Sequence, residues 1–184
     1  MTDLYTLPEA AVLGGKSYPH RTAWQDMLKL LRLLADEEKP AFLRWQIALA
    51  YFYLQPVPEE LTAQAAEYLS AFLTAGQSAV PGPKLFDWEQ DAAAIIADVN
   101  AAAGREVRSE RVHFWTFLSW FHSIREGQLS NLITIRDKLR RGKKLEPYEQ
   151  EFYRTHRDQV VLRRPVTAEE EAQKQRLNQM LSGQ

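Results

Sequence analysis

The densest apolar stretch of the chain lies between residues 111 and 124, where five aromatic side chains fall within eight positions. At about 100° per residue, one stripe recurs at the i, i+3, i+4, i+7 spacing that is typical of a buried helix face. The stripe is formed by Phe114, Phe117, Leu118, Phe121 and Ile124. The pattern predicts a central core helix over about 109–125, with Ser109 as its N-cap.

Several side chains of this helix lie off the buried stripe. Trp120 and His113 flank it, whereas Trp115 points well away from it, near His122. We interpret His113 as a hydrogen-bonded residue beside the core and His122 as an exposed partner of Trp115. Trp115 is therefore available either for contact with a partner or for packing against a neighbouring helix, and the packing is the simpler explanation.

Periodicity together with capping and breaking residues predicts seven further helices. They cover about 22–36, from Pro40 to before Pro56, 58–75, 87–104, 130–141, 147–162 and 167–181. Thr22 is the expected N-cap of the first, and Asp87 with Gln90 approximates a capping box. The helix that follows Pro40 is apolar nearly all round, so we expect it to be central in the fold.

The N-terminal segment has a different pattern. Gly14-Gly15 separates two short runs of β-prone residues, which is typical of a tight hairpin, and Pro19 ends the second run. We therefore predict a mainly α fold, a compact multi-helix domain with a small N-terminal β-hairpin. The expected organisation is a hairpin packed on the helices over 1–20, a helical domain over 21–163, and a charged C-terminal helix or tail over 164–184.

Composition excludes several classes of protein. The chain has 184 residues, and with 45 % of them hydrophobic it is too apolar to be disordered. Its 23 basic residues nearly balance its 24 acidic ones, so the net charge creates no strong electrostatic field around the molecule. Without cysteine it has no disulfide and no thiolate chemistry. No signal peptide and no membrane-spanning stretch is recognised. We expect a soluble cytosolic protein.

Searches for catalytic and ligand motifs give no persuasive site. Residues 10–17 (AAVLGGKS) match a permissive phosphate-loop pattern, but Tyr18-Pro19 follows where a helix should start, so a hairpin turn is favoured. Asp98 follows an apolar run at 95–97, as does the magnesium-binding aspartate that accompanies a phosphate loop, but the residues around Asp98 are predicted to be helical. The four histidines lack metal-ligand spacing. We therefore expect no enzyme activity, no cofactor and no metal.

Basic residues cluster at 136–144 (RDKLRRGKK). With the later arginines they could form a patch for phosphates, which makes a nucleic-acid-binding packaging or regulatory protein the alternative function. Basic residues are also favoured at a helix C-terminus, and acidic residues follow at once. An acidic protein partner explains the run equally well.

Five segments together resemble one protein family. Residues 85–92 (LFDWEQDA) and 112–117 (VHFWTF) resemble the paired signature of the tail assembly chaperones of tailed phages. Residues 133–138 (ITIRDK) and 148–153 (YEQEFY) are similar to its downstream segments, and 12–19 (VLGGKSYP) is similar to its opening hairpin. The family is encoded between the tail-tube and tape-measure genes of siphophages and prophages. The ordered resemblance extends over about residues 7–163.

The resemblance implies a non-enzymatic protein that works in the cytoplasm of the infected host and is absent from the mature virion. Its expected partner is the tape-measure protein, with the tail-tube protein as a second candidate, while a homo-oligomer is left open. No membrane contact is expected, and nucleic acid is a partner only in the alternative function described above. The residues that we nominate for partner contact are Trp115, His122, Trp120, Arg140, Arg141, Lys143 and Lys144.

Overall fold

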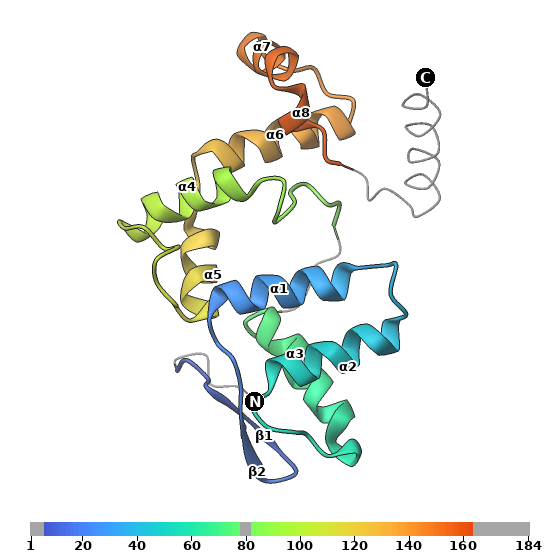
Figure 1. Cartoon of the computed structure of the whole chain (residues 1–184). Coiled ribbons are helices and arrows are strands. Elements are labelled where there is room, and N and C mark those ends of the chain that lie inside the picture. The colour runs from blue at the N-terminus through green and yellow to red at the C-terminus, as the bar shows by residue number, and fades with distance from the viewer. Residues whose placement is uncertain (1–5, 78–81, 164–184) are drawn as a thin grey trace, which may run out of the picture.

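The computed structural model describes residues 6–77 and 82–163 (Figure 1). Its elements, in chain order, are β1 (Ala10–Leu13), β2 (Lys16–Pro19), α1 (Trp24–Ala35), α2 (Ala41–Phe52), the 3₁₀ helix η1 (Glu59–Leu61), α3 (Thr62–Leu73), α4 (Ala92–Ala103), α5 (Phe114–Ser123), α6 (Gln128–Arg140), α7 (Pro147–Thr155) and α8 (Arg157–Val160). The predicted mainly α fold with a small N-terminal hairpin is confirmed. The helix predicted over 167–181 lies outside the described residues.

The hairpin forms where the Gly-Gly pair predicts it. β1 and β2 pair antiparallel, with Leu13 opposite Lys16 and a two-residue turn between them. Gly14 and Gly15 have φ angles of 53° and 80°, a left-handed conformation that costs glycine little and that two-residue hairpins require. Ala11 and Leu13 are buried, and β1 lies against α3. The hairpin is therefore stabilised by α3.

The helices form two groups that meet at α5. Helices α1, α2 and α3 contact one another in series and hold the hairpin, while α4 contacts α6, and α8 contacts both α6 and α7. α5 contacts α1 on one side and α4 on the other, and Figure 1 shows it between them. The aromatic segment singled out in the sequence therefore joins the two groups.

The core side of α5 agrees with the predicted stripe at its N-terminal half. Phe114, Phe117 and Leu118 are buried, whereas Phe121 and Ile124 are only half-buried. The ring of Phe117 stacks on Trp24 of α1, with 4.5 Å between centroids and 3° between planes. A stacked pair of this kind adds roughly 1 kcal/mol to the free energy gained from burial alone.

The predicted starts of α1 and α5 were wrong, and for the same reason. The residues that precede the two helices are extended and pair with each other through a bridge between Ala23 and His113. The Trp24 N–H donates to Val112, and the Phe114 N–H donates to Thr22, at 3.1 and 2.7 Å. Thr22 and Ser109 consequently cap neither helix.

The start of α5 is capped by a histidine. Nδ1 of His113 accepts the Trp115 backbone N–H at 3.1 Å, and Nε2 lies 3.1 Å from the Pro8 carbonyl oxygen. Since Nδ1 accepts, the proton of the neutral ring is on Nε2, which donates to Pro8. The predicted role of His113, a hydrogen-bonded residue beside the core, is confirmed.

The start of α6 is capped from another helix. The Asp98 carboxylate on α4 accepts the backbone N–H groups of Gln128 and Leu129 at 3.1 and 2.8 Å. This approach requires Gly127, because a Cβ there would lie 2.4 Å from the Asp98 carboxylate. Asp98 is thus a capping residue that joins α4 to α6.

Two other boundaries differ from the prediction. The Asp87 carboxylate accepts the N–H groups of Glu89 and Gln90, as expected for a capping residue. The N–H of Asp87 donates to the carboxylate of Asp91, however, and not to the side chain of Gln90 as the capping box requires. α4 begins only at Ala92. The helix predicted over 147–162 is interrupted at His156, which separates α7 from α8.

Candidate interaction surface

The solvent side of α2 carries an apolar surface. Phe42 is 67 % exposed, Ile47 40 % and Leu43 37 %, and just beyond the helix Leu54 is 59 % exposed. Leu43, Ile47 and Ala50 follow the i, i+4, i+7 spacing of one helix face, and Leu54 lies beyond the end of the helix. We call these residues together with Phe42 the α2 stripe. None of them is charged.

The opposite side of α2 explains why the stripe faces outward. Ala48, Leu49 and Phe52 are buried against the neighbouring helices. The one charged residue of α2, Arg44, donates from Nη1 to the Leu34 carbonyl at 2.6 Å, so its head is drawn toward α1. The expectation that this helix is central was wrong, because neighbouring elements cover only one side of it.

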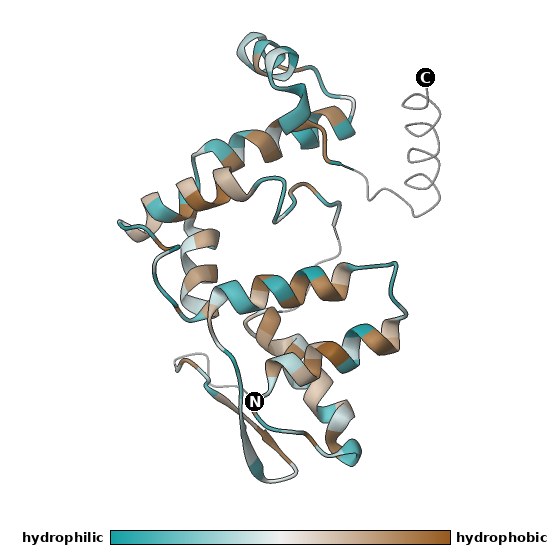
Figure 2. Ribbon diagram, in the orientation of Figure 1, coloured by the Kyte–Doolittle hydropathy of each residue, from teal (hydrophilic) through white to brown (hydrophobic). Residues whose placement is uncertain are grey.

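A hollow of about 540 Å³ continues the stripe at the end of α2. Its lining is largely apolar with two glutamines, and consists of Gln46, Leu49, Ala50, Tyr53, Leu54, Gln55, Pro56, Val57 and Thr62. Figure 2 shows brown, hydrophobic residues along α2, whereas α7 at the other end of the molecule is mostly teal and white. Large apolar surface next to a hollow is typical of a site that binds another apolar segment.

The aromatic residues nominated from the sequence lie elsewhere. Trp115 is only 8 % exposed, and its indole N–H donates to the Phe72 carbonyl oxygen at 2.9 Å. The simpler explanation for Trp115, packing against a neighbouring helix, is confirmed, because the end of α3 covers that side of α5. The nomination of Trp115 for partner contact was wrong, since the indole is not accessible. Trp120 is half-buried, with the Arg105 guanidinium 5.3 Å from its ring centroid.

His122 is exposed, as predicted, but it is not a partner of Trp115. Its ring lies beside Phe121, with 5.8 Å between centroids. The exposed side of α5 therefore presents His122 and part of Trp120. It offers far less apolar surface than the α2 stripe.

The basic run at 136–144 is divided among several acidic partners. Arg140 and Arg141 both pair with Asp137, at 2.9 and 2.8 Å, and these contacts hold the pKa of the Asp137 carboxyl below its usual range. Lys138 donates to Glu149 at 2.7 Å, which raises the pKa of Lys138. Only the two lysines at 143 and 144 form no ion pair with the described residues.

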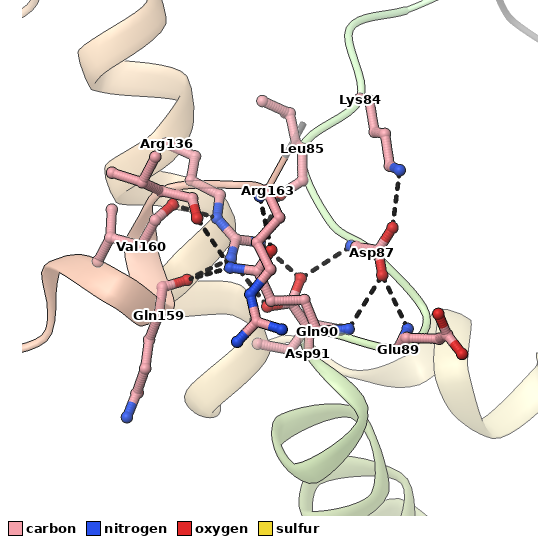
Figure 3. A network of polar contacts seen from close by, with 12 residues as sticks. Lys84, Leu85, Asp87, Glu89, Gln90, Asp91, Arg136, Gln159, Val160 and Arg163 are labelled. Carbon is pink, nitrogen blue, oxygen red and sulfur yellow. Dashed lines mark hydrogen bonds and ion pairs between the residues drawn. The ribbon is translucent and has the colours of Figure 1, made fainter. Parts of the chain in front are cut away.

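Arg136, the first residue of that run, is buried in a network that Figure 3 shows. Its guanidinium forms a bidentate pair with Asp91, at 2.6 and 2.8 Å. It also donates to the carbonyl oxygens of Leu85, Gln159 and Val160. All five guanidinium N–H groups are thereby used, which is the condition under which a buried ion pair is tolerated.

This network joins three segments that are distant in the sequence. Gln90 extends it, since its Nε2 donates to the carbonyl of Val161 at 2.8 Å and its Oε1 accepts the N–H of Arg163 at 2.8 Å (Figure 3). Asp87 and Lys84 pair at its edge, 2.7 Å apart. The segment before α4, helix α6 and the end of α8 are thus held together by polar contacts that are already satisfied within the chain.

The motifs rejected in the sequence analysis have structural roles. Lys16 begins strand β2 instead of a helix, so no helix N-terminus faces it as in a phosphate loop. The described ranges hold no group of three or more His, Cys, Asp or Glu side chains that could ligate a metal ion. In the described part of the chain no helix combines the length and the apolar character needed to cross a membrane.

Comparisons of this chain with models of known protein families, with curated proteins and with solved structures find no match. The site therefore has to be argued from its own residues. The sequence analysis missed the α2 stripe, although one signal for it was present: residues 41–54 contain a single charged residue, so a water-facing side had to be uncharged.

Proposed function

We propose that this chain is a non-enzymatic phage tail assembly chaperone that covers an apolar helical segment of the tape-measure protein. Two observations support the proposal. The ordered resemblance extends over most of the chain, and α2 presents apolar side chains to solvent with no charge among them. The α2 stripe carries the argument, because the resemblance by itself names no binding surface.

The physical reasoning concerns what a long helical protein needs before assembly. A tape-measure chain exposes apolar helix faces that would associate with one another unless they are covered. An amphipathic helix is covered by laying its apolar face against an apolar helix or groove, where a few large side chains act as anchors. Phe42 and Ile47 are side chains of that kind, and the hollow beside Ala50 accepts a further one.

The proposal includes the cellular setting that the resemblance implies. The chaperone would act in the host cytoplasm, bring tail-tube subunits to the tape-measure chain, and leave before the virion is complete. Tail-tube protein is therefore the second proposed partner. No step of this sequence requires a cofactor, a metal ion or a chemical reaction.

Co-expression with the tape-measure protein of the same phage or prophage genome tests the proposal. The expected result is that this chain raises the soluble fraction of the tape-measure protein and is recovered with it. A Phe42→Gln/Ile47→Gln variant should lose most of this effect. If the tape-measure protein is equally soluble without this chain, the proposal is wrong.

The structure offers a matched control for this variant. Tyr148 and Leu139 are 70 % and 38 % exposed, close to the values of Phe42 and Ile47, and they lie on α7 and α6. A Tyr148→Gln/Leu139→Gln variant should keep the solubilising effect. Both double variants should change the free energy of unfolding by less than about 1 kcal/mol, as expected for exposed positions.

The alternative, a nucleic-acid-binding protein, has less support. Of the basic side chains at 136–144, Arg136 is buried and three others are in ion pairs, which leaves Lys143 and Lys144 for phosphates. Two phosphate contacts give weak binding with a shallow salt dependence, a slope of about −2 in log K against log salt. A shift of phage DNA by this chain at low salt, abolished by Lys143→Gln/Lys144→Gln, would favour the alternative over the chaperone.

A further inference from the structure

We propose that the α2 stripe selects an amphipathic partner helix that carries basic residues at both ends of its apolar face. This inference rests on the proposed function and deepens it, because it specifies which helical segments are accepted. It is carried by the placement of acidic side chains at the two ends of an uncharged apolar stripe.

The stripe itself sets the length of the partner. α2 has 12 residues, which corresponds to about 18 Å at 1.5 Å per residue. A partner helix of about three turns laid along it would contact Phe42 and Leu43 at one end and Leu54 at the other. Its own apolar face would need the i, i+3, i+4, i+7 spacing of a helix that packs lengthwise.

Exposed acidic side chains lie in the chain segments that precede and follow the stripe. Glu37 and Glu38 are exposed in the turn before α2. Glu59 and Glu60 are exposed in η1, between Val57 and Thr62, two residues that line the hollow. None of these four carboxylates forms an ion pair with a residue in the described ranges.

The basic side chains that contact α2 do not cancel that charge, although the exposed Lys16, two residues after the Gly14 that lies against Leu61 of η1, forms no ion pair with a described residue. Lys39, next to Glu38, is bound by Asp36 through a hydrogen bond. Arg44 donates to a backbone carbonyl of α1, as described above. A partner helix therefore meets uncompensated carboxylates at each end, where Lys or Arg side chains would be attracted and Asp or Glu side chains repelled.

The same charges disfavour other occupants. If a second copy of this chain bound through the same stripe, both parallel and antiparallel arrangements would place carboxylates against carboxylates. Phosphates of a nucleic acid would be repelled in the same way. The basic-ended apolar helix is the occupant that matches both the stripe and its ends.

Two synthetic peptides test the inference on the full chain. Both are amphipathic helices of 14 residues with one leucine face, and they differ only in having Lys or Glu at the positions that flank this face at each end. We expect the Lys peptide to bind at least tenfold more tightly in fluorescence anisotropy at 150 mM salt. The difference should shrink at 500 mM salt, because exposed charges are screened.

Charge reversal on the protein is the complementary measurement. The Glu37→Lys/Glu38→Lys/Glu59→Lys/Glu60→Lys variant should prefer the Glu peptide, and the two paired variants, at 37–38 and at 59–60, should each remove about half of the effect on a logarithmic scale. A Glu126→Lys/Asp158→Lys variant, also at exposed positions, should behave like the parent chain. If the fourfold variant does not fold, the charge selection is still tested by the paired variants and by the binding of the two peptides to the parent chain.

The outcomes separate this inference from the function on which it rests. If both peptides bind equally and Phe42→Gln/Ile47→Gln abolishes both, the charge selection is wrong while the apolar binding surface stands. If neither peptide binds although co-expression still keeps the tape-measure protein soluble, the inference is wrong and the proposed function stands. If co-expression has no effect either, both are wrong.

Discussion

The indole N–H of Trp115 donates to the backbone carbonyl of Phe72, 2.9 Å away, and so joins the start of α5 to the last turns of α3. The rings of the two residues also lie 5.7 Å apart. The Phe72 carbonyl also accepts the Ala75 N–H at 3.1 Å, so the indole is a further donor to it from another helix. Trp115 is therefore part of the packing between α3 and α5.

Replacement of Trp115 should consequently reduce stability before it affects any partner. Trp115→Phe removes the hydrogen bond and should lower the free energy of unfolding by about 1–2 kcal/mol, while Trp115→Ala should lower it by about 3–5 kcal/mol. Urea unfolding followed by circular dichroism measures both. Trp120→Phe, at the half-buried neighbour, should cost less than about 1 kcal/mol, and a Trp115→Phe variant as stable as the parent would contradict this role.

The buried pair of Arg136 and Asp91 gives a second prediction. Arg136→Met leaves the buried Asp91 carboxylate without its cationic partner, with only the Asp87 N–H still donating to it, and should cost about 3–5 kcal/mol in the free energy of unfolding. Arg136→Lys should restore only part of this loss, because an ammonium group has three donors where the site uses five.

The control for that prediction lies on the same helix. Arg140→Met removes an exposed pair with Asp137 and should cost less than about 1 kcal/mol. In a double-mutant cycle, Arg136→Met combined with Asp91→Leu should cost less than the sum of the single changes. Equal losses for Arg136→Met and Arg140→Met would show that the buried network is unimportant.

His20 predicts a dependence of stability on pH. Burial lowers the pKa of His20 to about 4, and the ring, stacked on Phe52 at 4.4 Å, lies 3.1 Å from the Tyr68 hydroxyl. An unfolded chain takes up a proton on this histidine near pH 6.5, whereas the folded chain does so only near pH 4. The unfolded state therefore binds more protons between these values, and stability falls as the pH is lowered through this interval.

The expected loss from His20 is on the order of 3 kcal/mol between pH 7 and pH 4, at 1.36 kcal/mol for each pKa unit. Urea midpoints at pH 7, 5.5 and 4.5 should reveal it. His20→Gln lacks the titrating group, so its stability should be lower at pH 7 and should decline less steeply on acidification. Parallel pH curves for the two chains would assign the pH dependence to other groups.

Gly127 gives a fourth prediction. Gly127→Ala forces a methyl group against the Asp98 carboxylate and should cost about 2 kcal/mol, comparable to the loss of a helix cap. Asp98→Ala should cost a similar amount, and the double variant little more than either, because both changes break the same contact. Gly142→Ala is the control: its added Cβ meets nothing within 4 Å, so only the cost of its left-handed backbone, about 1 kcal/mol, remains.

Local patterns in the sequence predicted the parts of the fold that depend on local physics. The Gly14-Gly15 turn and the stripe through Phe114 and Phe117 are examples, because turn chemistry and helix periodicity act over a few residues. The late starts of α1 and α5 could not be predicted, since they depend on a bridge between Ala23 and His113, 90 residues apart in the chain.

The interaction surface shows the same limit. An apolar helix with a single charged residue, such as α2, has one pattern whether it is enclosed on all sides or exposed on one, and only the placement of α1 and α3 distinguishes the two cases. The nomination of Trp115 for partner contact was the converse error: its angle on the helix was predicted correctly, but α3 covers this second side of α5. The pairing of Arg136 with Asp91, 45 positions apart, left no recognisable signal in the sequence.

His113 has a consequence for how the molecule opens in acid. Burial lowers the pKa of this imidazole, which in its neutral form accepts at one nitrogen and donates at the other. Once protonated, it turns an N–H toward the N–H of Trp115, while its bond to Pro8 survives. The first turn of α5 would then fray while the segment that leads into the hairpin stays attached, so the junction of the two helix groups would loosen first at its aromatic end.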